Sequence, residues 1–212
     1  MSKKEQETLN LYHKFYASRQ LEKVSLFQVF QEKINANSVI YPGSFVHLSP
    51  AFVFPNVVLI DANQNAKRYF ESADYKSLID RNKRYPQKSS FQFFGQDYKT
   101  IIDSLVGQFD LILSFYAGYI SGPCKSYIRQ GGYLLVNDSH GDAGLANLDP
   151  DYQLVATINE SMNEYEWNEL NLNKYFTPKK PLPISMDYLL SFGKGLQYQE
   201  MASYYLFQYL GS

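Results

Sequence analysis

A glycine turn and a carboxylate are the parts of this sequence best suited to binding a ligand. A short β-rich run from Ser38 to Tyr41 ends at Pro42-Gly43-Ser44, and a second apolar run ends at Asp61, 18 residues after Gly43. Glycine lets a backbone approach a ligand closely, and a carboxylate at the end of the next strand accepts hydrogen bonds from ribose hydroxyls. This order and spacing predict a site for a nucleotide-like ligand.

The densest polar cluster of the chain is Asn137-Asp138-Ser139-His140-Gly141-Asp142, at the end of another predicted strand. His140 is suited to proton transfer because the unperturbed pKa of histidine is ~6.5. The histidine and the two aspartates could instead bind a divalent metal ion, although their spacing fits no diagnostic ligand pattern. A third interpretation is a loop that only caps the helix starting near Gly141.

The glycine and the other candidate acids also have structural interpretations. Gly43 could serve a turn that needs a positive φ, and Asp61 could cap the helix that follows it. Asp97 comes after the third predicted strand and could likewise cap a helix. Asp110 precedes its strand rather than ending it, and we interpret it as structural.

Strands and helices alternate over residues 38–138, which predicts a parallel sheet covered by helices. The expected strands are 38–41, 57–60, 90–94, 109–114, 133–137, 152–158 and 203–210. The expected helices are two within 3–34, a short one with Ser49 as N-cap and Pro50 at its first position, one at 64–80 broken near Ser72, and further helices at 98–106, 123–129 and 186–192. The pair Gly131-Gly132 is expected to end the helix at 123–129.

Length and composition predict one soluble domain. The chain has 212 residues, of which 45% are apolar and 19% charged, as in an ordinary globular protein. Its single cysteine, Cys124, excludes an internal disulfide and is typical of a reducing compartment. The polar first residues and the lack of an apolar run of ~20 residues argue against a signal peptide and a membrane span. We expect a cytoplasmic protein, and the sequence does not indicate its oligomeric state.

Charge is distributed unevenly along the chain. Residues 67–99 contain eight Lys or Arg and four acids, a balance of +4, whereas residues 130–173 contain eight acids and no Lys or Arg, a balance of −8. A polyanion would be repelled by the acidic segment unless the basic segment reached across. The pattern therefore favours a neutral or cationic small molecule, or a protein side chain, over a nucleic acid as substrate.

Five alternating strands followed by two more resemble the class I S-adenosylmethionine-dependent methyltransferase fold, in which the seventh strand enters antiparallel beside the sixth. VIYPGS stands where that family has its glycine-rich loop, and Asp61 stands where it has its ribose-binding acid. FDLILS matches the fourth-strand motif, and CKSYIRQGGYLLVND matches the helix, glycine turn and fifth strand. The resemblance covers roughly residues 35–210.

The resemblance implies a fold, a cofactor and a set of site residues. The fold is α/β, with a Rossmann-like, seven-stranded, mostly parallel sheet, helices on both faces and an antiparallel last strand, in a single domain (1–212) made of an N-terminal helical extension (1–35) and a core (36–212). The implied cofactor is S-adenosyl-L-methionine, bound by Tyr41, Pro42, Gly43, Ser44, Asp61, Ala62, Asp97 and Ser114. The implied catalytic residues are His140, Asp138 and Tyr116, the implied substrate-binding residues are Tyr119 and Asn137, and no metal site is implied.

Two alternative functions stay open at this point. The first loop has one glycine, Gly43, where the family motif has two or three, which leaves room for a binding or regulatory protein that kept the fold and lost catalysis. A nicotinamide-dependent oxidoreductase is less favoured, because an acid ending the second strand suits that cofactor too but the chain has no G-x-G-x-x-G motif.

Overall fold

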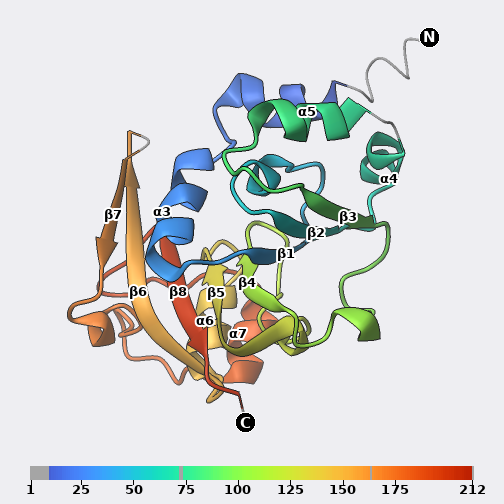
Figure 1. Ribbon diagram of the computed structural model, residues 1–212. Coiled ribbons are helices and arrows are strands. Elements are labelled where there is room, and N and C mark those ends of the chain that lie inside the picture. The colour runs from blue at the N-terminus through green and yellow to red at the C-terminus, as the bar shows by residue number, and fades with distance from the viewer. Residues whose placement is uncertain (1–9, 72–73, 163, 212) are drawn as a thin grey trace. The chain divides into compact units, whose positions relative to one another are not determined.

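The computed structural model describes residues 10–71, 74–162 and 164–211 (Figure 1). The chain divides into two compact units, one up to Thr100 and one from Ile101 onward. None of the helices in these described ranges is long and apolar enough to cross a membrane. The arrangement of the whole chain as one domain with an extension at 1–35, and the placement of helices on both faces of the sheet, stay predictions.

The first unit contains three parallel strands in the order β3-β2-β1. The strands are β1 (Ser38–Pro42), β2 (Asn56–Ile60) and β3 (Ser90–Phe94), and the helices are α2 (Leu11–Phe15), α3 (Val24–Ile34), α4 (Gln64–Phe70) and α5 (Asp74–Asn82). The pairing places Pro42 beside Ile60 and Ile60 beside Phe94. The turns that follow the three strands therefore lie at one edge of this sheet, the carboxyl edge at which α/β proteins bind ligands.

The second unit contains five strands in the order β4-β5-β8-β6-β7. They are β4 (Phe109–Ser114), β5 (Ile128–Val136), β6 (Tyr152–Ser161), β7 (Glu164–Asn168) and β8 (Tyr204–Tyr209), accompanied by helices α6 (Asp142–Leu148) and α7 (Met186–Phe192). β4 and β5 are parallel, and β8 runs antiparallel between β5 and β6. The expected antiparallel last strand beside the sixth is confirmed.

The structure describes eight strands, whereas seven are predicted from the sequence. The additional strand, β7, forms an antiparallel pair with β6. Its sequence, EYEWN, alternates acids with aromatic rings, and the acids are exposed while the rings are half-buried. This alternation is typical of a strand with one covered face, but the segment is not among the strands predicted above.

The helix predicted at 98–106 is wrong, because only a 3-10 helix at Asp103–Leu105 occurs there. Asp97 accepts the N–H of Lys99 at 2.9 Å, a bond of the kind that caps a helix and does not oppose one. The Tyr127 hydroxyl, 25 residues away in the sequence, accepts the N–H of Ile102, also at 2.9 Å. In a helix over 98–106 that N–H would donate to the carbonyl of Tyr98, so a tertiary hydrogen bond replaces a helical one.

The helix predicted before Gly131-Gly132 is also wrong. Lys125–Tyr127 form a single 3-10 turn, and β5 already begins at Ile128, so both glycines lie inside the strand. The register between β4 and β5 shifts at this point, and Gly131 has a φ of +76°. A Cβ on Gly132 would lie 3.0 Å from the carbonyl oxygen of Phe109. The glycines therefore form a bulge that lets the two strands approach, and they do not cap a helix.

The other predicted helices are present, with one capping error. α2 and α3 account for the two N-terminal helices, α7 has the predicted bounds, and the helix at 64–80 occurs as α4 and α5. The break expected near Ser72 lies outside the described residues. Ser49 does not cap its helix: it begins a 3-10 helix that has Leu48 as N-cap, and its hydroxyl is hydrogen-bonded to the hydroxyl of Tyr12 at 3.0 Å.

Candidate functional site

The glycine turn after β1 holds its shape through backbone contacts. Gly43 has a φ of +67°, a conformation that glycine adopts without strain, and its N–H donates to the carbonyl of Ile60 at 2.7 Å. Tyr41, Pro42 and Ser44 around it are buried. The turn thus satisfies the structural interpretation of Gly43, a residue with positive φ between two strands.

Asp61 joins this turn to the end of β2. Its Oδ2 accepts the N–H of Phe45 at 2.6 Å, and its Oδ1 accepts the N–H of Asn63 at 2.7 Å. Asp61 does not cap α4, because Asn63 does so by accepting the N–H of Asn65 at 2.8 Å. A carboxylate has about four acceptor positions, and Asp61 is partly exposed with Ala62 exposed beside it. Each of its oxygens can therefore accept a further hydrogen bond from a ligand.

Aromatic side chains from the N-terminal segment pack on the glycine turn. Phe15 meets Phe45 edge to face at 5.3 Å, and Tyr16 stacks on His47 with ring centroids 4.3 Å apart and planes 4° apart. Phe45 has a φ of +49°, an unusual conformation for a residue with a side chain that costs of order 1 kcal/mol. The bond from its N–H to Asp61 and the contact with Phe15 hold it there.

His47 lies next to this turn and is not among the residues predicted from the sequence. It is 3% exposed, and one ring nitrogen lies 3.1 Å from the carbonyl oxygen of Glu22. Burial lowers the pKa of His47 to about 4, so the ring is neutral at pH 7 and acts as a packing surface for Tyr16. In the sequence, the aromatic residues at 12, 15 and 16 indicate that the N-terminal segment packs against something, but they do not indicate that it packs on the loop containing His47.

Asp97 lies in the turn after β3 and is exposed. One carboxylate oxygen accepts the N–H of Lys99 at 2.9 Å, and a carboxylate has further acceptor positions that an exposed side chain can offer to a ligand. Gly95, just before it, is covered by the side chain of Lys67, which would lie 2.8 Å from a Cβ at this position. Lys67 of α4 therefore packs on the turn after β3, which contains Asp97, the acid that the resemblance assigns to adenine binding.

The end of β4 and the loop after it contain Ser114, predicted to bind the cofactor, Tyr116, predicted to be catalytic, and Tyr119, predicted to bind the substrate. Ser114 is 2% exposed, and its hydroxyl donates to Asp142 at 2.6 Å. Tyr116 has a φ of +58° and is 66% exposed. Tyr119 is half-buried and lies over Gly122, since a Cβ on that glycine would sit 1.8 Å from the tyrosine hydroxyl. The two tyrosines thus differ: Tyr119 is packed, and Tyr116 is open to a ligand.

The loop after β5 is linked to the loop after β4 through His140. His140 is exposed, and its Nε2 lies 3.2 Å from the carbonyl oxygen of Tyr116. A carbonyl only accepts hydrogen bonds, so Nε2 carries the proton and Nδ1 of the neutral ring is the basic nitrogen. The neighbouring Asn137 is buried and accepts the hydroxyl of Ser139 at 3.0 Å. The contact between Nε2 and the carbonyl of Tyr116 orients the His140 ring, with Nδ1 directed away from that carbonyl.

Asp138 has both the structural and the chemical features that the sequence left open. Its Oδ1 accepts the N–H of Gly144, in the first turn of α6, at 3.3 Å, so it does help to cap that helix. Its Oδ2 is buried and has no hydrogen-bond partner within the described ranges, and the backbone of Gly195 lies against it. Burial raises the pKa of Asp138 to about 6.

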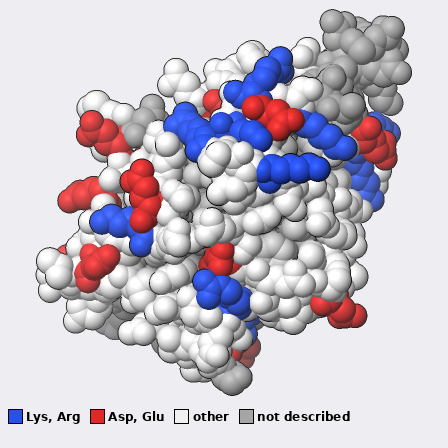
Figure 2. Space-filling model, viewed as in Figure 1, with Lys and Arg blue, Asp and Glu red and all other residues white. Residues whose placement is uncertain are grey.

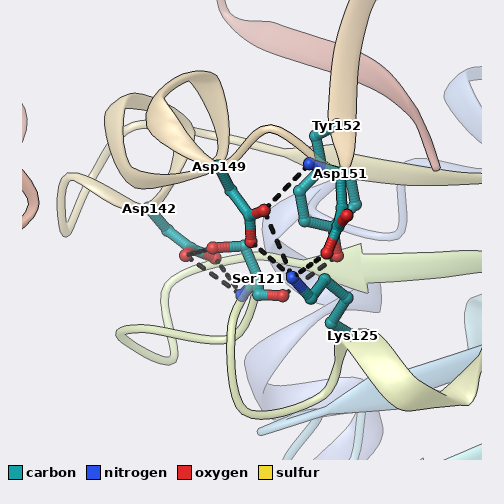
Figure 3. Close-up of polar contacts among 6 residues, drawn as sticks. All are labelled: Ser121, Lys125, Asp142, Asp149, Asp151 and Tyr152. Atoms are coloured by element: carbon teal, nitrogen blue, oxygen red, sulfur yellow. Dashed lines mark hydrogen bonds and ion pairs between the residues drawn. The ribbon is translucent and has the colours of Figure 1, made fainter. Parts of the chain in front are cut away.

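Asp142 is the residue around which this part of the second unit is built, although the sequence suggested it only as a metal ligand (Figure 3). It is 1% exposed. Its oxygens accept the hydroxyls of Ser114 and Ser121, both at 2.6 Å, and the N–H groups of Ile120 at 3.2 Å and Ser121 at 3.1 Å. Burial raises the pKa of Asp142, and these donors oppose that rise. The carboxylate fixes both ends of the loop that contains Tyr116 and Tyr119.

The neighbouring acids are engaged with a lysine. Lys125 forms ion pairs with Asp149, at 2.9 Å, and with Asp151, and the Tyr152 hydroxyl donates to the carbonyl of Ser121 at 2.9 Å (Figure 3). Within the described residues, no group of three or more His, Cys, Asp or Glu side chains is arranged to hold a metal ion. The acids of this region therefore bind a loop and a lysine of the same unit.

Comparison with known proteins identifies the fold. No protein-family model and no curated protein matches the chain. Among solved structures, a methyltransferase from Geobacter sulfurreducens is 12% identical, covers 97% of this chain and 90% of its own, and has a TM-score of 0.50. The O-methyltransferase TomG from Streptomyces achromogenes, in complex with SAM, is 13% identical over 79% of this chain and 87% of its own, with a TM-score of 0.48. An O-methyltransferase from Bacillus cereus, in complex with SAH, is 14% identical over 76% and 88%, with a TM-score of 0.46.

The likeness to the Geobacter protein establishes that this chain has the α/β, Rossmann-like methyltransferase fold. The resemblance drawn from the sequence is confirmed at that level. At an identity of 12%, this likeness establishes the fold but assigns no function to individual residues.

The Asp142 network predicts a large cost for a small change. Asp142→Asn replaces one acceptor oxygen by an NH2 group that faces donors, so at least one buried donor loses its partner. We expect the free energy of unfolding in urea to fall by roughly 2–4 kcal/mol. Asp97→Asn, at an exposed turn where asparagine also accepts the N–H, should change it by less than about 0.5 kcal/mol. Equal stability of the two variants would show that Asp142 does not hold this loop.

The raised pKa of Asp138 predicts a dependence of stability on pH. A carboxyl group with a pKa of 3.8 in the unfolded chain and about 6 in the folded protein binds more protons when folded. Its contribution to stability therefore falls as pH rises from about 4 to about 6, by roughly 2–3 kcal/mol, and is constant above that range. Urea unfolding of wild type and Asp138→Asn across this range measures it. The difference between the two proteins should change with pH, and a constant difference would exclude the shift.

Proposed function

We propose that this chain is a methyltransferase that uses S-adenosyl-L-methionine to methylate a small molecule or a protein side chain. The Geobacter protein whose fold it shares is described as a methyltransferase, and S-adenosylmethionine is the methyl donor that the sequence resemblance implies. The proposal concerns the reaction class and the cofactor, with the acceptor still to be identified.

The observation that carries the proposal is the position of Asp61. It follows β2 at the carboxyl edge of the first unit's sheet, its two oxygens are held by the N–H groups of Phe45 and Asn63, and it remains partly exposed. A carboxylate fixed in this way is prepared to accept two hydroxyls of a ribose without reorganising. The residues present therefore fit the nucleoside part of the cofactor.

The remaining cofactor contacts would come from the turns beside Asp61. We assign the backbone of residues 41–44 to contact with the methionine part of the cofactor. The oxygen of Asp97 that does not accept the N–H of Lys99 is assigned to the adenine amino group. When bound, S-adenosylmethionine supplies a methyl group on a positively charged sulfur. The chain contributes the position of that group, because methyl transfer is an in-line displacement that depends chiefly on alignment.

The acceptor side would be formed by the loops after β4 and β5. Tyr116, open at the surface, and Tyr119 and Asn137, more enclosed, would contact the acceptor. His140 would take the proton that an oxygen or nitrogen acceptor loses, at Nδ1, because Nε2–H is directed to the carbonyl of Tyr116. Asp138, with a pKa of about 6, would be largely ionised at pH 7 and is the second proton acceptor of this loop.

The proposed class of acceptor follows from the acidic residues at 130–173 that remain exposed after ion pairs and burial are taken into account. Of the eight acids at 130–173, Asp142 is enclosed and Asp149 and Asp151 are paired with Lys125. The exposed acids that remain are chiefly those of the β6–β7 hairpin and the residue after it, namely Glu164, Glu166 and Glu169. They still disfavour a polyanion at this part of the second unit, which supports a neutral or cationic acceptor.

The proposal is tested by calorimetric titration of the purified protein with S-adenosylmethionine, S-adenosylhomocysteine and NAD+. We expect micromolar binding of the first two and no binding of NAD+. Asp61→Asn keeps the shape of the side chain and removes its charge, and should weaken both affinities by about 10- to 100-fold. Asp187→Ala, at an exposed aspartate of α7, is the matched control and should bind as wild type does.

Failure of both S-adenosyl ligands to bind the folded wild-type protein at millimolar concentration would remove the enzyme assignment. Binding of NAD+ in their place would favour the oxidoreductase alternative. Thermal unfolding of each variant shows whether a lower affinity reflects the ribose contact or a loosened turn, because Asp61 also holds the N–H of Phe45.

A further inference from the structure

Basic side chains gather on one surface of the first unit, over α5 and the segment that follows it. Figure 2 shows the Lys and Arg side chains grouped there. The group, called the basic surface below, consists of Lys76, Arg81, Lys83, Arg84 and Lys88, and all but the half-buried Lys83 are exposed. Residues 74–89 contain only two acids, Asp74 and Asp80, and Asp80 lies 3.6 Å from Lys83. The surface is therefore strongly positive in a chain whose net charge is −1.

Aromatic rings are interleaved with these cations. The ammonium group of Lys76 lies 5.9 Å from the ring centroid of Tyr75, and that of Lys83 lies 5.9 Å from the ring of Tyr85. Tyr75 in turn packs against Phe91 of β3, with centroids 5.3 Å apart. A surface on which rings and cations alternate is suited to a single-stranded nucleic acid, because the bases can stack on the rings and the phosphates can pair with the cations.

A hollow of about 320 Å³ opens between the rings and the lysines. Its apolar lining is formed by Tyr75, Ile79 and Phe91, and its polar lining by Lys76, Lys88, Ser89 and Asp80, of which Asp80 also lies 3.6 Å from Lys83. Tyr75 and Phe91 are half-buried, so part of each ring is available for contact. The volume is sufficient for a planar base, and Lys76 and Lys88, which belong to the lining, are exposed and can reach phosphates beside it.

We propose that the basic surface binds single-stranded nucleic acid, with one unstacked base in the hollow of Tyr75 and Phe91 and the flanking phosphates on Lys76 and Lys88. A duplex keeps its bases stacked and paired, and therefore cannot fill the hollow. An acidic peptide would satisfy the lysines but has no planar group on every residue to stack on the rings.

The basic surface lies in the first unit, and its binding of a single strand does not depend on methyl transfer. The nucleic acid is a docking partner and not the methyl acceptor, a role that the charge of residues 130–173 disfavours. A chain that had lost catalysis would bind in the same way.

The test is fluorescence anisotropy of the full chain with a 5′-fluorescein-labelled oligo(U) of about 12 nucleotides, close to the length that one single-strand-binding domain covers. The same experiment is run with a labelled blunt-ended RNA duplex of equal charge and with unlabelled polyglutamate as competitor. At low salt, about 50 mM, we expect saturable binding of the single strand, at least tenfold weaker binding of the duplex, and little competition by polyglutamate.

Two pairs of variants separate the lysines from the rings. Lys76→Ala with Lys88→Ala should weaken binding about tenfold and reduce the slope of log K against log salt by about 1.4, or about 0.7 for each phosphate that is no longer neutralised. Lys179→Ala with Lys180→Ala, at exposed lysines of the second unit, is the matched control and should change neither. Tyr75→Leu should weaken binding at least fivefold with an unchanged slope, whereas Tyr75→Phe, which keeps the ring, should retain the affinity.

Several results would overturn the proposal. They are the absence of binding to the single strand at a protein concentration of about 100 µM, equal weakening in the test and control lysine pairs, and equal binding of the blunt-ended duplex and the single strand. Displacement of the oligonucleotide by polyglutamate at equal charge would identify a general polyanion surface instead. All of these outcomes are independent of cofactor binding, so they are distinct from a failure of the proposed enzymatic function.

Discussion

The hydrogen bond from the N–H of Phe45 to the carboxylate of Asp61 is the contact on which the candidate cofactor site depends. Phe45 follows the glycine turn in a left-handed conformation, and without an acceptor its N–H would make that conformation harder to maintain. The bond places the turn beside the end of β2 and presents Phe45 to Phe15. The N-terminal segment thereby packs on the turn, and one carboxylate connects three segments of the first unit.

In the second unit, too, a carboxylate holds a loop by accepting hydrogen bonds, and there the carboxylate is buried. Asp142 accepts hydrogen bonds from Ser114, Ile120 and Ser121, and so closes the loop that exposes Tyr116. Burying a carboxylate is costly unless donors surround it, and here the donors are short hydroxyls and backbone groups of the loop itself. The loop conformation and the buried carboxyl group therefore stabilise each other. In each unit one carboxylate holds a loop that follows a strand, and exposed groups of these loops are among those proposed to act on ligands.

Much of the fold was predictable because strands carry their signal locally. The continuous apolar runs at β2 and β4 and the position of Asp61 relative to Gly43 were sufficient to identify the α/β alternation and the resemblance to the methyltransferase fold. The helix predicted at 98–106 is absent, and the N–H of Ile102 donates instead to the hydroxyl of Tyr127, which is 25 residues away in the sequence. Ser49 was available as a cap in the sequence, yet its hydroxyl is bonded to Tyr12, 37 residues distant. The role of Asp142 could not be predicted for the same reason: its donors come from segments that only the folded chain brings together.

The most direct test of the role of Asp61 is NMR titration of the 15N-labelled protein with S-adenosylhomocysteine. If Asp61 binds the ribose while it holds the turn, the amide resonances of Phe45 and Asn63 should shift strongly and together, because both N–H groups donate to the carboxylate that receives the ligand. The amide of Gly43, in the same turn, should follow with the same affinity. Saturation of the protein by the ligand with these amides unchanged would place the cofactor elsewhere and contradict the central role given to Asp61.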